Sequence, residues 1–142
     1  MRMLFYWSIL AVTCGYALAW GRRHERLAAL VCIIASLAMP FVLAPFASRY
    51  DGLEAGVAVV DIGVLVVFVT IALQSDRFWP LWVAGLQLTS SMSHMFKAIS
   101  SDLLPWAYGA AGQFWSYPIL VIIAAAAWRS RRREARLEPA FE

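Results

Sequence analysis

Residues 54–74 read EAGVAVVDIGVLVVFVTIALQ, an apolar run that opens on Glu54 and holds one internal ionisable residue, Asp61. An α-helix rises about 1.5 Å per residue, so about 20 apolar residues cover the roughly 30 Å of hydrocarbon in a bilayer. A short polar turn at 75–79 follows, and a second apolar stretch occupies 80–100. The two stretches therefore predict a hairpin of antiparallel membrane helices.

The rest of the chain repeats this organisation. Apolar stretches of similar length occupy 3–20, 27–48 and 105–128. Of the 142 residues, 62% are hydrophobic and 15% are charged, whereas a soluble domain is about half apolar and about a quarter charged. A chain this short cannot hide the excess in a core. We therefore predict an all-α integral membrane protein, with a transmembrane bundle of five helices over 1–128, a basic cytoplasmic tail over 129–142, and no extramembrane domain.

The distribution of basic residues predicts the orientation of the bundle. Outside the membrane, five crossings leave only Arg2 and Arg49 on the side of the N-terminus. The opposite side receives the other arginines: Arg22, Arg23, Arg26, Arg77, Arg129, Arg131, Arg132, Arg133 and Arg136. Because basic residues accumulate on the cytoplasmic side of membrane proteins, we predict an N-out/C-in orientation. A four-crossing topology, with one segment lying on the membrane surface, would break this alternation of charge.

The basic tail also bears on partners and location. We expect the arginines that follow Trp128 to contact the anionic headgroups of membrane lipids, not nucleic acid. These residues are Arg129, Arg131, Arg132, Arg133 and Arg136. The short loops and the clear charge bias favour a bacterial inner (cytoplasmic) membrane.

A layer of polar residues is expected inside the bundle. Four of them recur along 80–100 with spacings of three, four and three, which places them on one helical face: Gln87, Ser90, His94 and Lys97. In a hairpin that turns at 75–79, Asp61 and His94 fall opposite each other, and Gln113 of the last segment lies at a similar depth. Intramembrane ionisable groups normally face the bundle interior or a wet cavity. We therefore predict that Asp61 and His94 meet.

Three interpretations of this layer remain open. It is a structural network that fixes helix register, or it is an outward-facing pocket in which Asp61 and His94 share a proton or hold a ligand. The third interpretation makes His94 an axial ligand of a haem or pigment. The only other histidine, His24, lies in the first basic turn, so one chain cannot supply both axial ligands of a haem. We predict no cofactor and no metal site, and keep haem or pigment at His94 as the alternative.

The sequence contains no motif for catalysis. A Gly-rich phosphate loop, CxxC, HExxH and GxSxG are all absent, and the loops are too short to build a catalytic shell. We therefore expect not an enzyme but an accessory or stabilising subunit of a larger membrane complex, with a membrane-protein partner or a homo-oligomer. The alternative is a small carrier, sensor or proton-handling protein that uses Asp61, His94, Lys97 and Gln113. An enzyme acting on lipid at the outer surface would instead need Asp61, His94 or Asp102.

Overall fold

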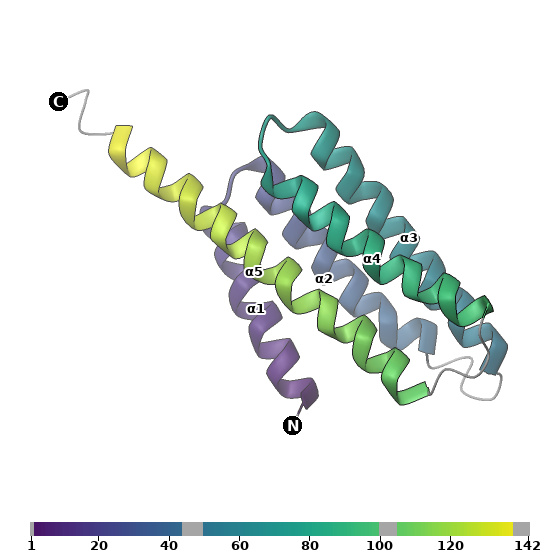
Figure 1. The fold of residues 1–142 in the computed structure, drawn as a ribbon. Helices are drawn as coiled ribbons and strands as arrows, with labels where there is room; N and C mark the ends of the chain where they lie inside the picture. The colour runs from purple at the N-terminus through teal and green to yellow at the C-terminus, as the bar shows by residue number, and fades with distance from the viewer. Residues whose placement is uncertain (1, 44–49, 100–104, 138–142) are drawn as a thin grey trace.

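The computed structural model describes residues 2–43, 50–99 and 105–137, and every regular element in these ranges is an α-helix (Figure 1). In chain order the helices are α1 (Arg2–Trp20), α2 (Arg23–Leu43), α3 (Tyr50–Gln74), α4 (Trp79–Ile99) and α5 (Pro105–Leu137).

The helix boundaries follow from local chemistry. Gly21 separates α1 from α2, and its main-chain N–H donates to the carbonyl of Ala17 over 2.8 Å. Proline suits the first turn of a helix because it lacks the N–H that would be unpaired there. Pro80 occupies the second residue of α4 and Pro105 the first residue of α5.

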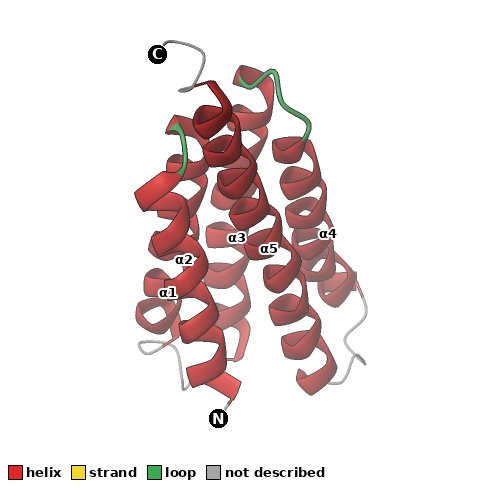
Figure 2. Ribbon diagram, turned by 90° about the vertical axis from the view of Figure 1, so that its left-hand side faces the viewer, coloured by secondary structure: helices red, strands yellow, loops and turns green. Residues whose placement is uncertain are grey.

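The helices pack side by side as a closed ring, which Figure 2 shows from the side. α1 contacts α2, α2 contacts α3, α3 contacts α4, α4 contacts α5, and α5 returns to α1; α2 also contacts α5. The α1–α2 turn, the α3–α4 turn and residues 129–137 of α5 all lie at the end of the bundle away from the N-terminus (Figure 1). We call this the arginine end.

Small and branched apolar residues form the core. Small side chains let helices approach closely where lipid surrounds them. The buried cluster comprises Leu10, Cys14, Ala17, Ala28, Ala29, Phe68, Ile71, Val83, Ala84, Ile119, Leu120, Ile123 and Ala127. Large apolar side chains also cover the outside, with Leu73 81% and Phe78 80% exposed. An apolar exterior of this kind is suited to lipid.

Three of the described helices are long and apolar enough to cross a membrane: Met3–Trp20, Arg23–Phe41 and Gly56–Gln74. The described part of the chain is thus all-helical, with at least part of its bundle suited to a bilayer.

Three observed boundaries extend well beyond the predicted ones. α3 begins at Tyr50, not at 54. α2 begins at Arg23, not at 27, so the basic turn belongs largely to the helix. α5 continues past Trp128 to Leu137, because arginine, glutamate, alanine and leucine all favour helix. The predicted residues 44–48 of the second segment lie outside the described ranges.

Candidate functional site

The candidate site centres on a contact between Asp61 of α3 and His94 of α4. His94 Nε2 lies 2.8 Å from Asp61 Oδ2, and the two side chains are 13% and 16% exposed, respectively. Asp61 lies 13 residues before Gln74, or about 20 Å from the arginine end. The contact therefore lies well inside the bundle, and it joins the two residues that the hairpin register places opposite each other.

Two further side chains of α4 bind the same residue of α3. The Ser90 hydroxyl donates to Asp61 Oδ2 over 3.3 Å, and Gln87 Nε2 donates to the main-chain carbonyl of Asp61 over 3.3 Å. Both donors are 6% exposed. One turn of helix separates Gln87 from Ser90 and another separates Ser90 from His94, so the face predicted for α4 is the face that meets α3.

This arrangement can hold a proton. A carboxylate only accepts hydrogen bonds, so His94 donates to Asp61 when Nε2 carries the hydrogen. The imidazole can be neutral or charged in that bond, and a charged imidazolium gives the shorter and stronger form. Because Nε2 faces Asp61, a haem iron would have to displace the carboxylate to bind at that nitrogen.

The other residues predicted for this layer are placed only by their helices. Lys97 lies on α4, three residues after His94, and Gln113 lies on α5; both side chains lie outside what the structure describes. His24 lies in the first turn of α2 at the arginine end, roughly 20 Å from His94 along the bundle. Within the described residues, no group of three or more His, Cys, Asp or Glu side chains could hold a metal ion.

A second polar cluster, which the sequence analysis missed, joins three elements at the arginine end. Glu25 of α2 is only 1% exposed, and its Oε1 accepts a hydrogen bond of 2.9 Å from the fully buried hydroxyl of Ser130 of α5. Arg77 of the α3–α4 turn donates to the Ser130 hydroxyl over 3.1 Å and lies 4.0 Å from Glu25 Oε1. Glu25 precedes the fully buried Ala28 and Ala29 by three and four residues, a spacing that signals its inward face.

The arginines of the predicted tail lie on the last turns of α5. The Arg131 guanidinium lies over the Trp20 ring, 4.7 Å from its centroid, and Arg132 lies 4.1 Å from the centroid of Trp128. Arg129, Arg133 and Arg136 are exposed on the same helical segment. This segment thus presents ordered guanidinium groups at the arginine end.

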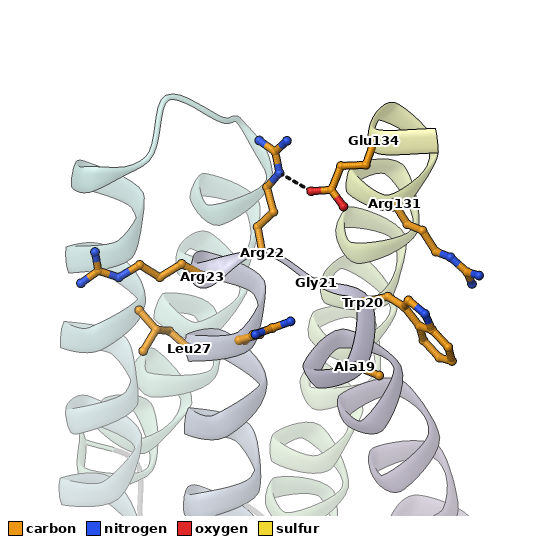
Figure 3. A pocket seen from close by; sticks show the side chains of 9 residues that line it. Ala19, Trp20, Gly21, Arg22, Arg23, Leu27, Arg131 and Glu134 are labelled. Carbon is orange, nitrogen blue, oxygen red and sulfur yellow. Dashed lines mark hydrogen bonds and ion pairs between the residues drawn. The ribbon is translucent and has the colours of Figure 1, made fainter. Parts of the chain in front are cut away.

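Two cavities open at the arginine end within the described part of the chain. One, of about 560 Å³, lies between the α1–α2 turn and α5 (Figure 3). The other, of about 580 Å³, lies between the α3–α4 turn and α5. Neither is lined by Asp61 or His94.

No protein-family model matches the chain, and neither curated proteins nor solved structures show a significant similarity to it.

Proposed function

We propose that the chain is an accessory or stabilising subunit of a larger membrane complex. One observation carries the proposal: the polar groups inside the bundle are used to bind one helix to another. Asp61 of α3 accepts a hydrogen bond from Ser90 and contacts His94, both on α4. Hydrogen bonds of this kind between membrane helices fix how α3 packs against α4, which is a structural role.

The outer surface is consistent with a scaffold role. Large apolar side chains are exposed around the bundle, including Phe41 at 77% and Trp82 at 69%. Lipid acyl chains can cover such a surface, and so can the apolar face of another membrane protein. We propose that a membrane-protein partner covers part of it.

Affinity purification in mild detergent, followed by mass spectrometry, tests this proposal. The proteins are first crosslinked chemically in intact membranes, so that detergent does not dissociate the complex. We expect a stoichiometric membrane-protein partner. A tagged, unrelated helical membrane protein of similar size is the control. A chain that crosslinks to nothing, or only to proteins that the control also captures, contradicts the accessory role.

A second function is favoured by the Asp61–His94 contact of 2.8 Å, which is suited to a shared proton. In this alternative the chain is a small carrier, sensor or proton-handling protein, and Lys97 and Gln113 complete an outward-facing site.

Purified protein in vesicles with a trapped pH-sensitive dye tests this alternative. Asp61→Asn should abolish proton flux, while Thr70→Ala should keep it, because Thr70 bonds only to its own helix at Val66. The absence of flux in the unaltered protein would leave no basis for the alternative.

We also propose that all five helices cross a bacterial inner membrane with the arginine end in the cytoplasm. The positive-inside bias of the sequence supports this orientation. At that end, the arginines of α5 are positioned to meet anionic lipid. They are Arg129, Arg131, Arg132, Arg133 and Arg136.

A further inference from the structure

We propose that the cavity between the α1–α2 turn and α5 binds the phosphate of one anionic phospholipid, whose acyl chain lies along α2. This inference goes beyond the accessory role and does not depend on it.

The cavity wall is strongly basic. Four arginines and one glutamate line it: Arg22, Arg23, Arg26, Arg131 and Glu134. Four positive charges and one negative charge leave a net charge of +3. The elements that carry them are distant in sequence, because Arg131 and Glu134 come from α5 and the other three from the α1–α2 turn and the first turn of α2 (Figure 3). The fold therefore places these residues around one cavity, with Arg23 and Arg131 extending to opposite sides of it in Figure 3.

The charge is only partly neutralised within the protein. Arg22 pairs with Glu134 over 3.0 Å, and Arg131 lies over the ring of Trp20. Among the described residues, no carboxylate pairs with the side chain of Arg23 or Arg26. Guanidinium groups bind phosphate through two parallel N–H donors. The two arginines are accordingly free of a carboxylate partner among the described side chains, and Arg23, which extends away from α5 in Figure 3, reaches an anion in the cavity by rotation of its side chain.

The remaining wall is apolar, which favours a lipid over a free phosphate ion. Trp20 and Leu27 line the cavity and are 47% and 40% exposed. From Leu27 an exposed apolar stripe continues along α2 with spacings of three, four, three and four residues: Leu27, Leu30, Ile34, Leu37 and Phe41. Residues at these spacings share one helical face. An acyl chain can therefore lie on this stripe while its phosphate reaches the arginines.

The second cavity is less suited to an anion. Its lining includes three arginines and Asp76, which leaves a net charge of +2. One of these arginines, Arg77, already donates to the Ser130 hydroxyl and pairs with Glu25. Basic pockets between membrane helices are typical sites for lipid headgroups, and tryptophan favours the same depth. Tryptophans line both cavities, Trp20 the first and Trp79 and Trp82 the second. The higher net charge of the first cavity is therefore what favours it.

Native mass spectrometry of the delipidated chain in detergent tests the proposal. The probes are phosphatidylglycerol, phosphatidylcholine with the same acyl chains, and glycerol phosphate. We expect one phosphatidylglycerol per chain, at concentrations where the zwitterionic lipid and glycerol phosphate do not bind. The double variant Arg23→Gln/Arg26→Gln should bind phosphatidylglycerol roughly 30-fold more weakly.

Two further variants separate a defined site from general attraction. Arg2→Gln/Arg49→Gln removes the same charge from the two arginines that the charge distribution assigns to the opposite side of the membrane, and it should change the affinity by less than about threefold, because distant charges are screened. Arg23→Lys/Arg26→Lys keeps the charge and the membrane insertion signal but loses the paired donors, so it should bind more weakly than the unaltered chain.

Three results would overturn the proposal. Equal binding of phosphatidylcholine, which has the same phosphodiester and an added quaternary ammonium, would show that the net negative charge of the headgroup is not recognised. Equal binding of glycerol phosphate would identify a free-anion site without a lipid component. Equal weakening by the two glutamine variants would assign the affinity to the overall charge of the chain.

Discussion

Asp61 is a carboxylate on a helix that is otherwise almost wholly apolar, and its partners all come from α4. Polar contacts between membrane helices contribute about 0.6 kcal/mol on average and up to about 1.7 kcal/mol. We expect a coupling free energy of about 1 kcal/mol between Asp61 and His94. A double-mutant cycle of Asp61→Ala, His94→Ala and the double variant measures it through the free energy of unfolding in mixed micelles.

The control for this cycle pairs Asp61→Ala with Thr70→Ala on the same helix. Thr70 donates only to the carbonyl of Val66, one turn earlier, so its change should add independently to that of Asp61. If the Asp61–His94 coupling is no larger than the Asp61–Thr70 coupling, the 2.8 Å contact does not stabilise the bundle.

Glu25 and Ser130 form the second contact whose removal has a defined consequence. Ser130→Ala removes the hydroxyl that donates to Glu25 Oε1 over 2.9 Å and leaves a buried acceptor without that donor. We expect the free energy of unfolding to fall by about 1–3 kcal/mol. Ser8→Ala is the matched control, because the exposed Ser8 hydroxyl donates only to Leu4 of its own helix; it should change stability by less than about 0.5 kcal/mol. Equal stability of the two variants would mean that the buried cluster is energetically unimportant.

The close packing of α1 against α2 depends on Gly21. A Cβ atom at this position would lie 2.3 Å from the carbonyl oxygen of Ala17 and 2.9 Å from Glu25 Cβ. The first of these is a main-chain atom, which cannot move without disturbing α1. We therefore expect Gly21→Ala to lower the free energy of unfolding by about 1–3 kcal/mol, measured by thermal unfolding in detergent.

Gly63 provides the control within α3. A Cβ atom there meets nothing within 4 Å, and alanine favours helix over glycine by roughly 0.5–1 kcal/mol. Gly63→Ala should therefore keep or raise the unfolding temperature. If both variants melted at the temperature of the unaltered protein, the α1–α2 junction would tolerate a wider spacing than the structure gives it.

The sequence predicts the helices better than their ends. The length of an apolar stretch predicts the central part of a helix. Charged residues such as Arg23 and Arg136 extend the helix beyond that stretch, and the apolar pattern does not predict them. The Asp61–His94 contact follows from sequence because a hairpin with a short turn fixes the register of its two helices. The Glu25–Ser130 contact does not, since it joins α2 to α5 and depends on how the whole ring closes.

The cavity at the arginine end likewise could not be predicted from the sequence. Arg22 and Arg131 are 109 positions apart in the chain (131 minus 22) and line one cavity. Charge counting assigns both to one side of the membrane, but only the closure of α5 onto α1 brings them together. The positions of the arginines in the sequence therefore predict the charge of this surface, but they do not predict the cavity.

The orientation of the whole bundle is the final prediction, and it follows from the uneven distribution of arginine between its two ends. With five crossings, a green fluorescent protein fused after Phe78 or Leu137 should fluoresce, because both points lie on the cytoplasmic side. An alkaline phosphatase fused after Ile99 should be active, because that point lies outside. The reciprocal fusions at each point should be silent. A four-crossing topology instead places the two ends of the chain on the same side, so a silent fluorescent fusion after Leu137 combined with an active phosphatase there would contradict the five-crossing arrangement. The positive-inside bias makes that outcome unfavourable, because it would carry the arginines of α5 across the membrane.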